Sequence, residues 1–206
     1  MRSYINKKDF LVFFQDLEAA NNRDDLEKLF ITFSLKRRDK KYLDIEYDIS
    51  KEDIEQLIKT KFLTNEFSLN PLLAKNINLT LLEKLLFALC WKNGHLGKEL
   101  RIILGILGLN NFNVNSGIVF NQFGKHLNNK DEIIIDQHVM RAYIFYKEIK
   151  KGNEGIIKKD ISPSDYIYYL DDYKSWINNN ELYRNNKRLL DELLFSLGKN
   201  MKKVIK

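Results

Sequence analysis

Residues 132–143 read EIIIDQHVMRAY, and this stretch decides how the rest of the chain is interpreted. Three isoleucines run into Asp136, and apolar residues with helical spacing begin at Val139. Aspartate is among the residues preferred at a helix N-cap, so the stretch predicts a helix that starts at Gln137. Two interpretations of Asp136 stay open, because a carboxylate can cap the helix and can also perform acid or base chemistry.

The same helical spacing recurs along most of the chain. Apolar stripes occupy residues 10–20, 26–35, 54–62, 85–91, 100–109 and 118–123. The chain has two prolines, and its clearest strand-like alternation is the short segment 42–49. These observations predict an all-α protein.

Several helix boundaries are marked by capping sequences. Thr80 and Glu83 form a capping-box pattern ahead of an apolar run, and the helix that follows is expected to be central. Ser162 and Asp165 enclose a proline at the first helical position, which predicts a helix start. A helix that contains residues 118–123 is expected to close near Gly124 and the exposed turn at 128–131, and a last one to cover 187–201.

We expect one all-α domain with two lobes. A terminal lobe would combine residues 1–75 with 160–206, and a helical core would cover 76–159. The loops at 39–49 and 150–162 are the expected boundaries.

Composition limits the class of protein. With 44% apolar and 30% charged residues in 206 positions, the chain is expected to bury a sizeable core. Its first ten residues turn charged where the apolar region of a signal peptide should begin. The longest apolar run, 102–109, is far shorter than the roughly 20 residues of a membrane-spanning helix. Cys90 is the only cysteine, which excludes an internal disulfide. We therefore expect a cytoplasmic protein that does not associate with membranes.

Basic residues are in excess. Lysine and arginine outnumber aspartate and glutamate by six, which is a mild indication of a polyanionic partner. The densest basic runs are 36–41 and 199–206, and the second is expected to fray. Either run could bind phosphates or form a solvated face. The aromatic-rich segment 166–176 must be partly buried, and the remainder could stack on bases.

Common catalytic motifs are missing from the sequence. It contains no Walker loop and no G-x-G-x-x-G, G-x-S-x-G or H-E-x-x-H pattern. The three histidines, His95, His126 and His138, match no metal-ligand spacing. We expect neither a metal nor an organic cofactor.

Residues 81–143 resemble the helix-hairpin-helix DNA glycosylase superfamily. In that family a pattern of the form [VI]-D-x-H-V-x-R delivers an aspartate to the start of a helix that lines the base pocket. The preceding helix commonly ends in Phe-Gly, and residues 121–124 read NQFG here. Segment 188–199 is similar to a closing helix of such folds. The positions that match the aspartate pattern are Ile135, Asp136, His138, Val139 and Arg141.

The resemblance is incomplete at the hairpin. Family members have a Leu-Pro-Gly-[VI]-Gly type of turn, whereas residues 107–117 keep Gly108 and Gly117 without the proline or the close glycine pair. The nucleophilic lysine of bifunctional members falls at about Asn113, which cannot form a Schiff base. Trp91 stands approximately where many members place a glutamine beside the flipped base. Its indole could wedge into a base stack or belong to the core.

The resemblance implies a monomeric, two-lobe protein of the helix-hairpin-helix glycosylase type that binds duplex DNA. It would flip a base into a pocket between the helix at 80–92 and the helix that starts at 137, and release it by water attack. Asp136 would be the essential carboxylate, because it can stabilise an oxocarbenium-like sugar. The alternatives are a non-enzymatic helical protein that keeps the fold and binds DNA or a protein, and an unrelated helical interaction protein. The other expected DNA-binding or pocket residues are Trp91, Asn93, Asn113, Ser116, Gly117, Gln137, His138 and Arg141.

Overall fold

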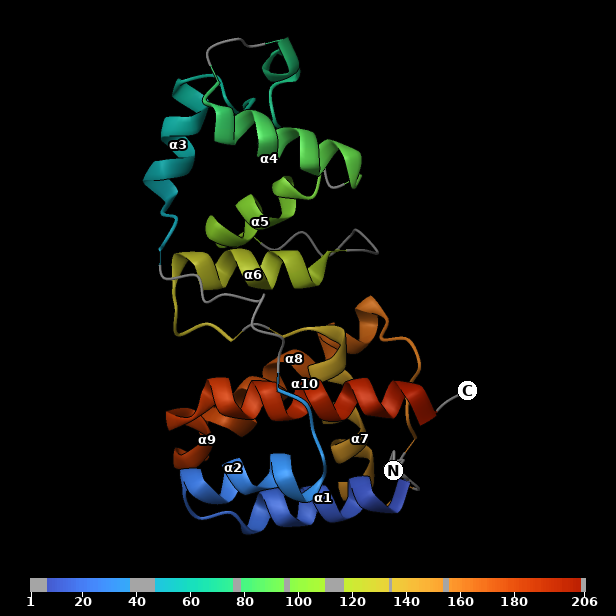
Figure 1. Cartoon of the computed structure of the whole chain (residues 1–206). Coiled ribbons are helices and arrows are strands. Elements are labelled where there is room, and N and C mark those ends of the chain that lie inside the picture. The colour runs from blue at the N-terminus through green and yellow to red at the C-terminus, as the bar shows by residue number, and fades with distance from the viewer. Residues whose placement is uncertain are drawn as a thin grey trace. The chain divides into compact units, whose positions relative to one another are not determined.

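The computed structural model describes residues 7–37, 47–75, 79–94, 97–109, 117–133, 135–153 and 156–204. Within these ranges the chain is helical, with one isolated bridge between Leu63 and Leu69 and no strand (Figure 1). The prediction of an all-α protein is therefore confirmed. The part of segment 42–49 that precedes Tyr47 lies outside the described residues.

Tertiary contacts divide the chain into two compact units. The first unit is Met1–Asp44 with Ile133–Lys206, and the second is Ile45–Glu132. The break at 44/45 falls within the loop 39–49 that was expected as a boundary, and the break at 132/133 falls outside the other expected loop, 150–162. The lobes expected from the sequence would break at 75/76 and 159/160. The first unit contains α1 (Lys7–Ala19), α2 (Arg23–Thr32), α7 (Gln137–Lys150), α8 (Pro163–Asn178), α9 (Glu181–Asn185) and α10 (Lys187–Val204). The second contains α3 (Lys51–Lys59), the 3-10 helix η1 (Pro71–Lys75), α4 (Leu81–Lys92), α5 (Glu99–Ile106) and α6 (Ile118–Asn128).

Helix α7 is the central helix of the first unit. All residues from 139 to 146 are buried. Because a helix turns once every 3.6 residues, such a run needs partners on every side. The rings of Phe10 and Phe14 in α1 approach Phe145, with centroids 5.9 and 6.3 Å away, and α8 and α10 also pack on α7.

The predicted capping sequences start their helices as expected. Thr80 forms a capping box with Glu83 at α4, and Ser162 forms one with Asp165 at α8, with proline in the first turn. Helix α10 begins at Lys187 and continues to Val204. The expected fraying of residues 199–204 is therefore wrong, and the reason is that this part of the helix packs on the unit, with Met201 fully buried.

A crossing of α5 and α6 explains the place of Gly124. Gly124 lies inside α6, which continues to Asn128 and so ends at the turn expected at 128–131. A Cβ on Gly124 would collide with the backbone of Ile102, and a Cβ on Gly105 would collide with that of Asn121. The glycine lets two helix backbones approach closely, so at this position it does not end the helix. The core of this unit contains Ile54, Leu63, Ile103, Ile106 and Leu127.

Helix α4 is not central. None of its residues is buried, although nine of the twelve, from Leu81 through Trp91, are apolar. The buried core of the second unit draws on α3, α5 and α6 instead. Trp91 is 67% exposed, so the interpretation of its indole as a core side chain is also wrong.

Candidate functional site

Asp136 caps α7 with one of its two carboxylate oxygens. Its Oδ1 accepts the backbone N–H groups of His138, at 2.6 Å, and Val139, at 3.0 Å. No described residue donates a hydrogen bond to Oδ2. Ile135, directly before it, is fully buried, whereas Asp136 itself is half-exposed. The capping prediction is confirmed, and the second oxygen remains accessible.

Arg141 is fully buried and donates its hydrogen bonds to the protein. Its Nε and one terminal nitrogen donate to the carbonyls of Lys158 and Lys159, both at 2.7 Å. The other terminal nitrogen donates to the Gly198 carbonyl at 3.3 Å. The guanidinium thus fastens the segment before α8, and α10, to the first turns of α7. In this arrangement Arg141 holds the site together.

The same guanidinium fixes the protonation of His138. Nη1 of Arg141 lies 2.7 Å from Nδ1 of His138, and because arginine can only donate, Nδ1 must accept and the ring proton resides on Nε2. Burial lowers the pKa of His138, and the charges of Arg141 and Lys202 lower it further, against opposing effects of Asp136 and the Gly198 carbonyl. His138 is therefore neutral at pH 7, and its ring packs edge-on against Phe195 with centroids 5.2 Å apart.

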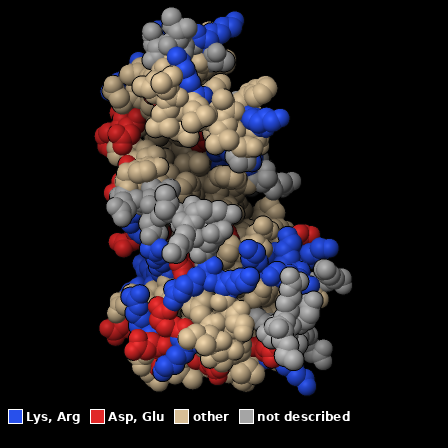
Figure 2. Space-filling view, in the orientation of Figure 1, with Lys and Arg blue, Asp and Glu red and all other residues tan. Residues whose placement is uncertain are grey.

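Helix α10 brings lysines to the start of α7. Gly198 lies so close to His138 that a Cβ would collide with the His138 carbonyl, and the helices can cross there only because this residue is glycine. Lys199, the next residue, and Lys202, one turn further along α10, have no acidic partner among the described residues. Figure 2 shows lysine and arginine side chains in a band where Figure 1 draws α10.

Tyr166 of α8 lies close to this cluster. It is 5% exposed, and its hydroxyl has no hydrogen-bond partner among the described residues. Burial raises the pKa of Tyr166, the Asp136 carboxylate raises it further, and Arg141 opposes both. A buried hydroxyl without a partner costs about 1–3 kcal/mol. The aromatic-rich segment was expected to be partly buried, but its sequence gave no sign that this tyrosine lies near Asp136.

The remaining expected site residues are spread over the chain. Gln137 is exposed on the first turn of α7. Trp91, Asn93 and Gly117 belong to the second unit, whereas Asp136 belongs to the first. A pocket formed from both sets remains a prediction. Asn113 and Ser116, like His95, lie outside the described residues.

The basic run 36–41 is described only at its first two residues. Lys36 donates its backbone N–H to the Ser196 hydroxyl at 3.0 Å. The Arg37 guanidinium pairs with Glu27 and, at 3.4 Å, with Glu192. Arg37 therefore neutralises carboxylates of its own unit.

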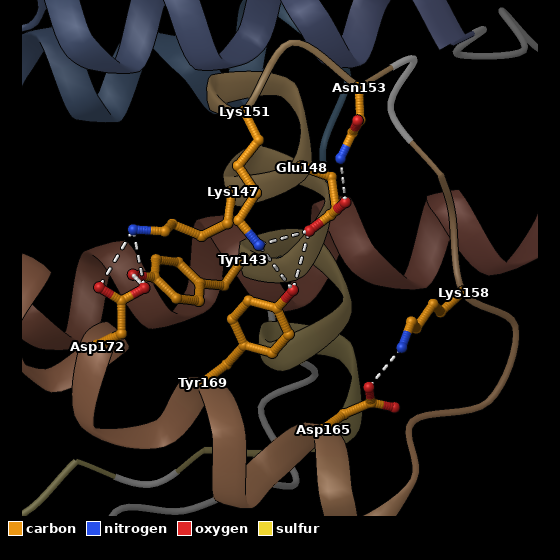
Figure 3. Close-up of polar contacts among 9 residues, drawn as sticks. All are labelled: Tyr143, Lys147, Glu148, Lys151, Asn153, Lys158, Asp165, Tyr169 and Asp172. Carbon is orange, nitrogen blue, oxygen red and sulfur yellow. Dashed lines mark hydrogen bonds and ion pairs between the residues drawn. The ribbon is translucent and has the colours of Figure 1, made fainter.

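A polar pocket on the first unit was missed by the sequence analysis. It has a volume of about 450 Å³, and α1, α7, α8 and α9 all contribute to it. Tyr143 and Lys147 of α7 reach Asp172 of α8, at 2.9 and 2.8 Å (Figure 3). In the sequence, only the aromatic spacing of α8 indicated such a surface. The carboxylate that α1 contributes, Glu18, could not be anticipated, because it is 128 positions from Tyr146, whose hydroxyl donates to it.

Two other kinds of site are absent from the residues that the structure describes. In the part of the chain that the structure describes, no three His, Cys, Asp or Glu side chains cluster as metal ligands would. No helix there is long and apolar enough to cross a bilayer. Comparison of the chain with protein-family models, curated proteins and solved structures finds no match.

Proposed function

We propose that this protein binds duplex DNA and releases a base by hydrolysis of its N-glycosidic bond, as a divergent monofunctional glycosylase of the helix-hairpin-helix type. The observation that carries the proposal is that the two carboxylate oxygens of Asp136 have different surroundings. Oδ1 is held by two backbone N–H groups, whereas Oδ2 has no hydrogen-bond partner among the described residues. A cap alone needs one oxygen, and the second is available for chemistry.

Hydrolysis of a nucleotide needs an anion at this position. As the bond between C1′ and the base nitrogen breaks, its electron pair leaves with the base and positive charge develops on the sugar. Oδ2 of Asp136 would stabilise that charge and accept a proton from the attacking water, whose oxygen forms the new bond to C1′. The products are a free base, which takes up a proton, and an abasic site.

Fixed geometry around Asp136 supports this role. The backbone of α7 orients the carboxylate, and Arg141 ties the first turns of α7 to α10 through the Gly198 carbonyl. The ammonium groups of Lys199 and Lys202 lie on α10 near this point and can bind DNA phosphates. A catalytic group held by helices is positioned more accurately than one on a loop.

Two substitutions of Asp136 test the proposal. Asparagine caps a helix about as well as aspartate but cannot supply the anion, whereas alanine loses both, at a typical cost of about 0.5–2 kcal/mol. Asp136→Asn should keep stability and DNA affinity while base release from a panel of modified duplexes, read by mass spectrometry, falls by orders of magnitude. Asp136→Ala should lose release and some stability. Full release by Asp136→Asn would reduce Asp136 to a cap.

A second candidate is a DNA-binding protein without activity. It is favoured by the side chains of Arg141 and His138, which bond within the protein, while the α10 lysines are free to contact phosphates. Such a protein would bind duplexes with a steep salt dependence and release no base from any member of the panel. Borohydride should trap no adduct in either case, since the Schiff-base position corresponds to Asn113.

A further inference from the structure

The pocket on the first unit has an aromatic wall. Trp176 of α8 is half-exposed and covers two buried tyrosines, with ring centroids 5.4 Å from Tyr146 and 4.9 Å from Tyr183. Both tyrosine hydroxyls are used, because one donates to Glu18 at 2.7 Å and the other to the Leu17 carbonyl at 3.0 Å. The indole is therefore the most exposed ring of this wall.

Two carboxylates from different helices stand at this wall. Glu18 lies in the last turn of α1 and Asp172 lies on α8, and their side chains keep 37% and 44% of their accessible surface. For both, partial burial acts to raise the pKa, but hydrogen bonds from lysine and tyrosine outweigh it and hold the pKa below its usual value. Both are ionised at neutral pH.

The lining contains two carboxylates, those of Glu18 and Asp172, and one ammonium, that of Lys147. Each carboxylate has a lysine partner, because Lys147 pairs with Asp172 at 2.8 Å and Lys150, which is not a lining residue, pairs with Glu18 at 2.6 Å. The Lys150 ammonium also lies 5.7 Å from the centroid of the Tyr146 ring, so this wall already attracts a cation. Ion pairs this exposed to water contribute little, so a bound cation can take the place of a lysine at small cost. An anionic ligand would be repelled by the two carboxylates. A neutral aromatic ligand would offer them no charged partner.

We propose that this pocket binds an organic cation, with an alkylammonium group against the Trp176 indole and between the Glu18 and Asp172 carboxylates. Tryptophan is the strongest of the aromatic side chains in attracting cations. The volume of about 450 Å³ is within the usual range for small-molecule sites. Asn179, Asn180 and Ser175 line the remainder and can orient polar atoms of the ligand. This site is independent of the DNA chemistry proposed for Asp136.

A ligand pair that differs only in charge gives the first test. Choline and 3,3-dimethylbutan-1-ol have the same shape, and one has nitrogen where the other has carbon. In full-length protein with Trp91→Phe, Trp176 is the sole indole and its fluorescence reports binding. Choline should bind about tenfold or more tightly than the neutral alcohol. Equal affinity, or no binding of any ammonium probe, would overturn the proposal.

Matched carboxylate variants give the second test. Asp172→Asn keeps an acceptor for Tyr143 and should weaken choline binding by about tenfold. Asp171→Asn changes the same charge at an exposed neighbour outside the lining, and should leave affinity within about twofold. Equal effects of the two variants would mean that choline responds only to the overall charge of the protein, and would overturn the proposed site. Parallel titrations with spermidine and with Nα-acetyl-lysine amide, whose side-chain ammonium is free, distinguish a free amine from a protein side chain as the source of the cation.

Discussion

Helices α7 and α4 are capped helices of similar length whose surroundings differ completely. α7 has fourteen residues and a run of eight buried ones. α4 has twelve residues, a complete capping box and no buried residue. By composition α4 is the more apolar of the two, with nine apolar residues in twelve against eight in fourteen. Apolarity therefore does not decide which helix becomes the core of its unit.

The number of partners explains the difference. α7 receives side chains from α1, α8 and α10, which come from both ends of the chain. The second unit buries the α5 and α6 pair against α3 and leaves the leucines of α4 exposed. Exposed apolar patches of this kind commonly mark interaction surfaces. The difference in burial implies that side chains of α7 contribute more to the free energy of unfolding than those of α4. Substitutions in the two helices test this.

The largest expected effect is a truncation in α7. Phe145→Ala removes a fully buried ring and should cost about 3–5 kcal/mol. Leu85→Ala removes a side chain that is 65% exposed and should change stability by no more than about 0.5 kcal/mol. Denaturant-dependent hydrogen exchange, read by mass spectrometry, reports each unit separately. A cost above about 1.5 kcal/mol for Leu85→Ala would mean that α4 is covered in solution, and the comparison would fail.

The same contrast shows what could be predicted from the sequence. Helix starts at Gln137, Pro163 and Leu81 follow from capping residues and apolar spacing, which are local. The exposure of α4 does not follow, because burial depends on which distant helices supply partners. The end of α6 was expected near Gly124 and the turn at 128–131; the helix ends at Asn128, and Gly124 lies inside it because α5 crosses there.

The candidate site also contains features that the local sequence could predict and features that it could not. The capping role of Asp136 could be predicted because its partners are two and three positions away. Arg141 was expected at the DNA, but its carbonyl partners are 17, 18 and 57 positions away. No local sequence pattern predicts these carbonyl partners. The cation pocket escaped prediction for this reason too, since Glu18 and Asp172 come from helices at opposite ends of the chain.

The second expected effect concerns the polar anchor of α7. Arg141→Met keeps an apolar stem but leaves the carbonyls of Lys158, Lys159 and Gly198 without their donor. The loss should be about 2–4 kcal/mol, because unpaired buried polar groups are costly. Arg188→Met is the matched control, since its side chain is 70% exposed, and should cost at most about 0.5 kcal/mol. Similar losses in both variants would contradict an anchoring role.

A smaller effect of opposite sign is expected in the second unit. Gln122 of α6 is fully buried, and neither polar atom of its amide has a hydrogen-bond partner among the described residues. Gln122→Met keeps the volume and removes the unpaired groups, so it should stabilise this unit by about 1–2 kcal/mol. The exposed Gln56 of α3 provides the control Gln56→Met, which should be neutral within about 0.5 kcal/mol. Destabilisation by Gln122→Met would show that the amide has a partner after all.

The smallest expected effect is the pH dependence that His138 adds to the first unit. Burial and the charges of Arg141 and Lys202 lower the pKa of His138 in the folded state, against Asp136 and the Gly198 carbonyl. The unfolded chain therefore binds the proton more readily, and the free energy of unfolding should fall as the pH drops below the unfolded value of about 6.5. The fall ends once the pH is below the folded pKa, and its slope cannot exceed about 1.4 kcal/mol per pH unit.

Asparagine at position 138 isolates this contribution. His138→Asn keeps an acceptor near the position of Nδ1 for Arg141 but cannot titrate, so the fall in stability between about pH 6.5 and pH 5 should flatten. His126→Asn is the matched control in the second unit, because an amide can replace the ring N–H that donates to the Glu132 carbonyl at 2.8 Å, and it leaves His138 in place. Hydrogen exchange of α7 across this range measures both variants. If stability of the first unit in His138→Asn keeps the pH dependence of the natural chain, the proton is taken up elsewhere, and the Arg141–His138 contact does not govern it.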